Sequence, residues 1–257
     1  FSPFYPLRRK YIFLGYIFEY FILRKTDVLI LGGGSVLHSE NSITWKKRLV
    51  EKYREVSKKK TRVFGISLGL GPFKTERAKK KCRELLNSLD VASFRDKPSF
   101  LFAKKCMKKG VALHSFDVSA TYCDMFGVKQ RESVSEIHTI GVVLKKGSGS
   151  HSLRQKHKEL IIKLSKKYDY VRVFAFCTSE KFGEGEYIKQ ILYELSLSNV
   201  LFIPYLGDCF QFLQSLRSCD FIISVRLHGL IISYLLNIPF YALSYHKKCD
   251  DFLSEVG

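Results

Sequence analysis

Apolar residues occur along the chain in short runs that alternate with longer segments of helical periodicity. Short runs bounded by glycine or polar turns indicate buried strands, and the longer amphipathic segments indicate helices. In the first half this pattern predicts strands at Asp27–Leu31, Arg62–Ser67 and Val91–Phe94, and helices at Trp45–Lys58, at Glu76–Ser88 and after the third strand. Because helices follow the strands one by one, we expect βαβ units and a parallel sheet.

A second series of the same kind begins at Thr139. It predicts strands at Thr139–Leu144, Tyr170–Phe176, Val200–Ile203, Phe221–Ser224 and Phe240–Leu243, and helices at Leu153–Lys167, Tyr187–Leu195, Cys209–Arg217 and Leu230–Leu236. The segment Lys129–Glu136 between the two series is polar and lacks apolar periodicity, so it is the predicted linker. The pattern therefore predicts an α/β protein of two Rossmann-like domains, residues 1–130 and 137–257, with a ligand cleft between them.

The apolar stretch Tyr11–Leu23 has the composition of a membrane segment but not its length. It is shorter than a span requires, it contains Glu19, and no small-residue cleavage site follows it. We expect a buried or interfacial helix, which could touch a membrane surface.

Net charge is the unusual property of this composition. The 257 residues are 46% hydrophobic and 26% charged, as in a globular protein, but the formal net charge is +19. Such a field favours an anionic partner: nucleic acid, an acidic lipid surface, or phosphorylated and carboxylated small molecules. Lysine-rich runs such as Arg77–Arg83 and Lys104–Lys109 are interleaved with Cys, Leu and Met rather than with aromatic residues, which disfavours nucleic acid.

Cysteine usage bears on the compartment and on metal binding. The seven cysteines are scattered and odd in number, and no CxxC pair occurs, so neither a zinc knuckle nor a disulfide framework is indicated. A reducing cytoplasm is the simplest location. Paired carboxylates and clusters with metal-ligand spacing are absent from the sequence, which argues against a metal-dependent hydrolase.

Glycines follow the first predicted strand, at the edge where ligands of parallel sheets bind. Gly32, Gly33, Gly34 and Ser35 permit close backbone approach, and N–H groups at a helix start attract anions. A tight strand-to-helix turn explains the same residues equally well. The spacing is neither that of a dinucleotide fingerprint nor that of a P-loop, so no NAD or ATP site is assigned.

Basic residues and one histidine follow three other predicted strands. Arg95 comes directly after Val91–Phe94, where it could form an ion pair with Asp96 or bind an anion through its two-pronged guanidinium. Arg226 and His228 follow Phe221–Ser224, and Lys248 comes a few residues after the next strand. A lone histidine is more often structural than catalytic. Cations from both halves would suit a small ligand that carries several negative charges.

Several of these stretches together resemble the polysaccharide pyruvyl transferase family. The resemblance runs from about Asp27 to the C-terminus, in family order and spacing, through DVLILGGGSVL, FGISLGLGP, SFRDKPS, FDVS and SVRLHGLIISYLLNIPFYALSYHKKCDDFLSEVG. The RLH signature and the residues after it are the specific part. Members of the family have a GT-B-like fold and transfer a pyruvyl group from phosphoenolpyruvate to a sugar, forming a ketal in cell-surface or exopolysaccharide biosynthesis.

The resemblance implies roles for particular residues. Arg95, Arg226 and Lys248 would bind the phosphate and carboxylate of phosphoenolpyruvate, and His228 would be the acid or base. The turn of Gly33, Gly34 and Ser35 would line the N-terminal side of the cleft. No metal or organic cofactor is required, and the acceptor sugar could be lipid-linked, so attraction to the inner face of an anionic membrane is compatible with this function.

The sequence departs from the family pattern in three places. Family members usually begin with an earlier strand and a Gly/Asn-bearing loop, and they continue beyond the equivalent of Gly257, so a fragment or shortened member is one interpretation. The common SYDPK stretch reads SYHKK here, which bears on acceptor specificity.

Two other functions compete with pyruvyl transfer. A GT-B glycosyltransferase would use a nucleotide sugar and would need a carboxylate for the ribose, for which Asp208 and Glu184 are candidates. A basic, non-enzymatic binder of nucleic acid or anionic membrane would use the lysine runs, but it leaves the ordered residues at the strand ends unexplained.

Overall fold

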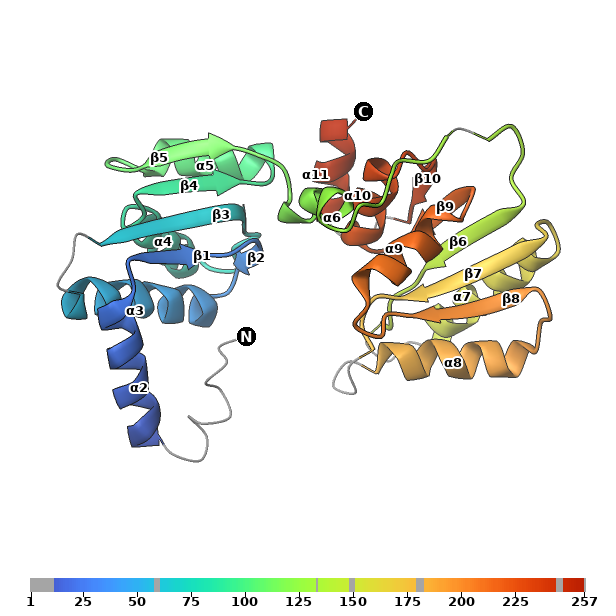
Figure 1. The fold of residues 1–257 in the computed structure, drawn as a ribbon, viewed down its shortest axis with the longest axis horizontal. Coiled ribbons are helices and arrows are strands. Elements are labelled where there is room, and N and C mark those ends of the chain that lie inside the picture. Colours follow the sequence, from blue (N-terminus) through green and yellow to red (C-terminus); the bar gives the residue numbers. More distant parts are fainter. Residues whose placement is uncertain are drawn as a thin grey trace. The chain divides into compact units, whose positions relative to one another are not determined.

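The protein folds into two compact units, Phe1–Val118 (unit 1) and Ser119–Gly257 (unit 2), each built on its own parallel sheet (Figure 1). The computed structural model describes residues 12–57, 61–132, 134–147, 151–178, 183–243 and 247–256. The α/β class and the two parallel sheets predicted from the sequence are confirmed.

Unit 1 is a βα series with its strands in chain order. Its strands are β1 (Val28–Leu31), β2 (Gly34–Leu37), β3 (Arg62–Leu70), β4 (Val91–Phe94) and β5 (Val111–His114). Its helices are α2 (Ile12–Lys25), α3 (Glu40–Val56), α4 (Glu76–Leu86) and α5 (Lys97–Cys106). The sheet order is β1-β3-β4-β5, and β2 pairs with the far end of the long strand β3.

The two faces of the unit 1 sheet differ in burial. One face carries the core, in which Val63, Ala92 and Phe94 are fully buried under residues of α3, α4 and α5. On the opposite face Ile30 and Leu113 are about half exposed, at 52% and 49%. The register explains this division, because side chains at paired positions of neighbouring parallel strands point to the same side of the sheet.

The glycine turn after β1 differs from its prediction. Gly34 has a φ of +86°, which glycine adopts without strain, and the chain then resumes pairing with β3 as strand β2. Helix α3 starts only at Glu40, where Ser39 caps it by accepting a hydrogen bond from the N–H of Ser42. The Gly32–Ser35 turn therefore lies between two strands and not at a helix N-terminus.

Unit 2 is a doubly wound domain. Its strands are β6 (Thr139–Val143), β7 (Tyr170–Ala175), β8 (Val200–Pro204), β9 (Phe221–Ser224) and β10 (Phe240–Ala242). Its helices are α6 (Tyr122–Met125), α7 (His151–Ser165), α8 (Glu184–Leu195), α9 (Cys209–Arg217), α10 (Leu227–Leu235) and α11 (Lys247–Val256). The short helix η1 (Val118–Thr121) begins at the last residue of unit 1 and continues into unit 2.

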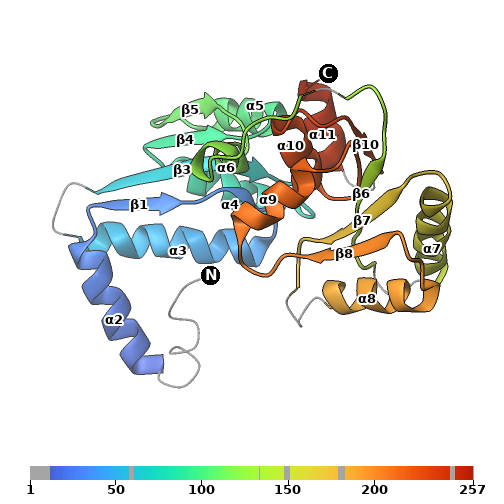
Figure 2. The ribbon, with the colours of Figure 1, turned by 45° about the vertical axis from the view of Figure 1, so that its right-hand side comes forward.

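The strand order of unit 2 explains its two cores. All neighbours in the order β10-β9-β6-β7-β8 are parallel, so the chain moves to one side from β6 and returns to the other side through β9. Right-handed crossovers then place α7 and α8 on one face of the sheet and α9 and α10 on the other (Figure 2). Each face has its own cluster of buried residues, with Ile161 and Ile188 in one and Phe212 and Ile232 in the other.

The predicted linker Lys129–Glu136 is part of unit 2. Arg217 Nε donates to the carbonyl of Lys129 at 2.8 Å, and the N–H of Arg131 donates to the carbonyl of Leu236 at 2.8 Å. Arg131 also forms an ion pair with Asp220. The boundary between the units therefore falls before this segment, between Val118 and Ser119. The segment is polar because it lies on the surface of unit 2, not because it links two domains. Residue 133 lies outside the described residues.

The apolar N-terminal stretch forms helix α2, but it is not a buried helix. Of the described side chains Leu23 is buried, whereas Phe18 and Phe21 are about half exposed. Of the two alternatives, the buried helix does not describe this segment, and an interfacial helix stays a prediction. Within the described part of the chain, no helix combines the length and hydropathy needed to cross a bilayer.

Candidate functional site

The carboxyl ends of β6 and β9 mark the point where the strand order of unit 2 reverses. These two strands are neighbours, and their successors lie on opposite sides of them. Ligands of doubly wound sheets bind in the crevice at such a switch point. The residues that leave these two strands are Leu144 and Lys145 from β6, and Val225 and Arg226 from β9.

The turn from β9 into α10 is built by small residues. Ser224 is buried; its Oγ accepts from the N–H of Arg226 at 3.0 Å and donates to the carbonyl of Arg226 at 2.9 Å. Gly229 lets the helix approach the strand, because a Cβ there would lie 2.3 Å from Ser224 Oγ. The sequence S-V-R-L-H-G thus presents Arg226 and His228 at the edge of the sheet.

Arg226 is held by a buried carboxylate. Its Nη2 forms an ion pair with Glu184 Oε2, and the other oxygen of Glu184 accepts from the N–H of Cys177 at 3.2 Å. Glu184 is 2% exposed and lies in the first turn of α8, whereas the side chain of Arg226 is 25% exposed. The buried carboxylate of Glu184 therefore holds the guanidinium in place, while part of the Arg226 side chain remains exposed to solvent.

His228 stands at the rim of a cavity of about 250 Å³ within unit 2. The imidazole is exposed, whereas Phe212, Leu213 and Ile232 are buried and form the floor. The remaining lining residues are Tyr122, Phe176, Tyr205 and Cys209. Apart from the imidazole, the described residues that line the cavity present aromatic, aliphatic and thiol groups and no ionic side chain.

The aromatic wall of this cavity is packed around Phe212. The ring of Phe212 meets Phe176 at a centroid distance of 5.0 Å and Tyr205 at 5.5 Å, both edge to face. Tyr205 Oη lies 3.2 Å from Cys209 Sγ, and this hydrogen bond raises the pKa of Tyr205. These rings are thus positioned by one another before any ligand enters.

Lys248 lies in the first turn of α11, after β10. Burial raises the pKa of the Cys249 thiol, Asp250 adds to this, and the nearby charges of Lys248 and Lys145 act against it. The charges of both lysines thus act on one thiol, although the two residues follow different strands. Residues 244–246, which include the His246 of SYHKK, lie outside the described residues.

Arg95 lies in unit 1 and is buried, with 6% of its side chain exposed. Its Nη1 donates to Asp117 Oδ2 at 2.7 Å, and its Nε lies 3.8 Å from Asp96 Oδ2. Asp96 also caps α5 by accepting from the N–H of Ser99 at 2.8 Å. The ion-pair interpretation thus describes the structure, with Asp117 as the closer partner; a role for Arg95 toward an anion stays a prediction.

The glycine turn is close-packed at one position. A Cβ on Gly33 would lie 3.2 Å from Val118 Cγ1 and 3.4 Å from the carbonyl oxygen of Ser67. Gly33 therefore packs against the end of β3, while the backbones of Gly34 and Ser35 belong to β2. That this turn lines a ligand site stays a prediction.

Arg226 and His228 are thus placed at one edge of unit 2, and Arg95 and the glycines belong to unit 1. Sequence reasoning missed Glu184 as the partner of Arg226, Lys145 at the end of β6, and the aromatic cavity. Glu184 had been weighed only as a ribose ligand. A signal for Lys145 was present, because it leaves the first strand of the second series.

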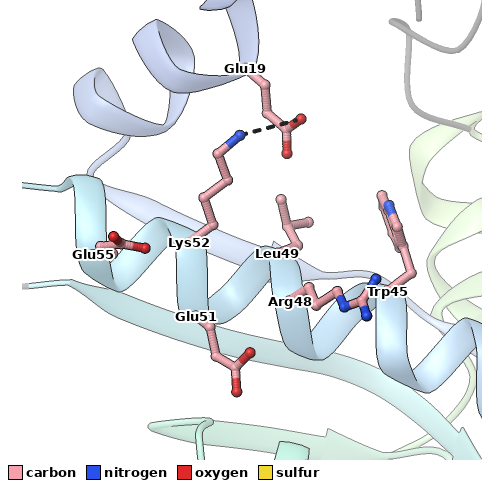
Figure 3. Close-up of a pocket in the computed structure, with 7 residues that line it drawn as sticks. All are labelled: Glu19, Trp45, Arg48, Leu49, Glu51, Lys52 and Glu55. Atoms are coloured by element: carbon pink, nitrogen blue, oxygen red, sulfur yellow. Dashed lines mark ion pairs between the residues drawn. The ribbon is translucent and has the colours of Figure 1, made fainter. Parts of the chain in front are cut away.

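A second cavity, of about 490 Å³, lies between α2 and α3 in unit 1. Figure 3 shows Trp45, Arg48 and Leu49 on α3 and the ion pair of Glu19 with Lys52, whose charged atoms are 3.7 Å apart. None of the predicted site residues is among the residues that line it. It is therefore not the candidate site.

Metal binding finds no support in the side-chain geometry that the structure describes. Among those residues no group of three or more His, Cys, Asp or Glu side chains is placed to hold an ion.

Comparison with protein families gives one match over most of the chain. The model of the polysaccharide pyruvyl transferase family matches residues 1–247. No curated protein matches the chain by sequence.

Solved structures resemble the chain in fold at low identity. UDP-GlcNAc 2-epimerase from Methanocaldococcus jannaschii has a TM-score of 0.58 and 13% identity, and the match covers 88% of this chain and 64% of that one. The Neisseria meningitidis UDP-GlcNAc 2-epimerase bound to UDP-GlcNAc has a TM-score of 0.60 and 11% identity, covering 91% and 64%. A structure of TarM has a TM-score of 0.51 and 12% identity, and the match covers 90% of this chain and 45% of that one. The chain thus has a fold of the GT-B type and spans less than two thirds of the length of these proteins.

Proposed function

The chain belongs to the polysaccharide pyruvyl transferase family, and we propose that it transfers the pyruvyl group of phosphoenolpyruvate to two hydroxyls of a sugar, as a ketal. The acceptor would be a precursor of a cell-surface polysaccharide, carried on a lipid or a nucleotide. Peripheral attraction of the basic chain to an anionic membrane fits a lipid-linked acceptor.

The observation that carries this proposal is the placement of Arg226 and His228 at the switch point of unit 2. A fixed guanidinium and an exposed imidazole leave the same strand, next to the strand that delivers Lys145. Phosphoenolpyruvate carries a phosphate and a carboxylate on one vinyl group, so it needs fixed cations and a proton-transfer group. These residues supply both.

The chemistry proceeds through an electrophilic C2. Protonation of the methylene carbon makes C2 resemble an oxocarbenium ion, and the first sugar hydroxyl adds to it and loses its proton. The C2–O bond to phosphate then breaks, and phosphate leaves with the electron pair. The second hydroxyl adds to C2, loses its proton and closes the ketal.

Residues of the chain serve the steps of this scheme. Arg226 and Lys248 hold the donor anion and stabilise charge on the departing phosphate, and Arg95 would do so from unit 1. His228 gives or takes one proton, an effect worth on the order of a hundredfold or more. The buried carboxylate of Glu184 orients Arg226.

The test is phosphate release from phosphoenolpyruvate with a panel of lipid-linked and nucleotide-linked sugars. The His228→Ala variant should lose turnover by about a hundredfold or more while its thermal unfolding stays that of the wild type, because the imidazole is exposed. Near-normal turnover of this variant would remove His228 from the mechanism.

A nucleotide-sugar glycosyltransferase is the other enzyme class that is compatible with this fold. Its two candidate carboxylates have internal roles: Asp208 caps α9 by accepting from the N–H of Gln211 at 3.0 Å, and Glu184 pairs with Arg226. A thermal-shift comparison separates the two functions. Phosphoenolpyruvate should stabilise the protein more than UDP-GlcNAc does, and the reverse order would favour the glycosyltransferase.

A further inference from the structure

The cavity beside His228 differs in chemistry from the cationic edge next to it. Its floor of Phe212, Leu213 and Ile232 is buried, its walls are aromatic, and among the residues that the structure describes no lysine or arginine lines it. Phosphoenolpyruvate carries several negative charges, so it would lose hydration there without gaining a cation. The cavity is therefore suited to an uncharged part of a ligand.

We propose that this cavity is the acceptor subsite, in which the ring of the sugar that receives the pyruvyl group packs on Tyr122 and Tyr205 beside His228. This inference rests on the proposed function. The C–H groups of a pyranose face are weakly positive, and they complement the negative face of an aromatic ring. Sites of this kind combine apolar walls with a few polar groups that fix orientation.

The position of His228 supports this assignment. The imidazole belongs both to the rim of the cavity and to the turn that carries Arg226. A sugar ring in the cavity would have its hydroxyls at that rim, where the proton of an attacking hydroxyl has to be removed. Donor and acceptor would then meet across one side chain, the donor on the cationic side and the acceptor on the aromatic side.

Tyr122 offers the cleanest test, because its side chain is partly exposed and lies on the short helix α6 rather than in the floor. Tyr122→Ala should raise the KM for the acceptor about tenfold and leave the KM for phosphoenolpyruvate unchanged. Tyr122→Phe keeps the ring and should recover most of that affinity. Tyr193→Ala is the matched control, since Tyr193 is an 88% exposed tyrosine of the same unit, outside the cavity.

A binding measurement separates this proposal from the catalytic one. Ligand-observed NMR with methyl glycosides of hexoses and N-acetylhexosamines should show binding to the wild type and to Tyr193→Ala, and loss of the signal in Tyr122→Ala. If this holds while no acceptor supports phosphate release, pyruvyl transfer fails and the sugar subsite stands.

Other outcomes overturn the subsite. The proposal fails if the wild type releases phosphate but Tyr122→Ala and Tyr205→Ala keep the acceptor KM of the wild type. It also fails if no methyl glycoside binds. Binding of uridine monophosphate that depends on Tyr122, without binding of any glycoside, would assign the cavity to a nucleobase instead.

Discussion

At the scale of single residues, the pairing of Arg226 with Glu184 decides how substitutions at the site should be interpreted. Glu184 is almost completely buried, and its two oxygens serve Arg226 and the N–H of Cys177. A carboxylate in such a position is tolerable because a guanidinium compensates it. Removing Arg226 therefore does two things, since it deletes a candidate anion ligand and leaves a buried charge without its partner.

This leads to a prediction about stability. Arg226→Ala should lower the free energy of unfolding of unit 2 by roughly 3 kcal/mol, the usual consequence of breaking a buried pair from one side. Adding Glu184→Gln should restore much of that loss, because the amide still accepts the hydrogen bond from Cys177 and carries no charge. Urea denaturation of the two single variants and the double variant measures this coupling.

The double variant also isolates the chemical role of Arg226. If Arg226→Ala with Glu184→Gln is as stable as the wild type and still lacks turnover, the guanidinium acts on the substrate. Additive losses of stability in the denaturation series would instead show that the two side chains are not coupled in solution.

Sequence reasoning at this scale identified which residues are unusual but not what they contact. Arg95 was correctly placed after a strand, and its proposed ion-pair partner was the adjacent Asp96. The closer partner is Asp117, which follows the neighbouring strand β5. Because β5 is short and partly exposed, its apolar signal is weak, so the neighbour of Arg95 across the sheet edge was hidden in the sequence.

At the scale of elements, the close approach of α10 to β9 positions the histidine. Gly229 lies three residues after Arg226. No larger residue fits there, because a Cβ would lie 2.3 Å from Ser224 Oγ and 3.2 Å from Val143 Cγ2. Both neighbours are buried and belong to strand ends, so they cannot move away cheaply.

We therefore predict that Gly229→Ala destabilises unit 2 by about 1–3 kcal/mol, as overpacking of a core usually does. It should also lower turnover, because α10 has to shift and carries His228 with it. Gly185→Ala in α8 is the matched control, since the nearest described atoms to its Cβ would be those of Thr178, at an ordinary contact distance of 3.7 Å. That variant should be neutral or slightly stabilising by thermal denaturation. Equal stability of the two variants would contradict the packing argument.

Element prediction succeeded where periodicity and burial coincide, as in α9 and β9, whose bounds match the sequence pattern. It failed for β2, because the preceding glycines were taken for a strand-to-helix turn. It also missed α11, whose first residues Lys247 and Lys248 follow a strand and give no apolar signal. For β2, pairing with β3 and not local propensity determines the structure.

At the scale of the whole molecule, both units are built on a parallel sheet, but the two sheets are covered differently. Unit 2 has helices and buried clusters on both faces, as parallel sheets generally require. In unit 1 the described helices cover one face, and apolar side chains such as Ile30 and Leu113 are half exposed on the other. The apolar runs of the sequence predict β1, β3 and β4 of unit 1 and the strands of unit 2, but they predict neither β2 and β5 nor which face of each sheet is covered.

The net charge of +19 gives the last prediction, because it acts on substrates before they reach the site. A field of this sign attracts phosphoenolpyruvate and leaves an uncharged glycoside unaffected. Between about 0.1 M and about 1 M sodium chloride the screening length falls from roughly 10 Å to roughly 3 Å. The KM for phosphoenolpyruvate should then rise by roughly an order of magnitude, whereas the KM for a neutral acceptor stays constant. Steady-state kinetics with each substrate varied in turn measures both values. A parallel rise of the two would indicate that salt perturbs the fold, and no change in either would mean that the scattered lysines do not guide the donor to the edge formed by β6 and β9.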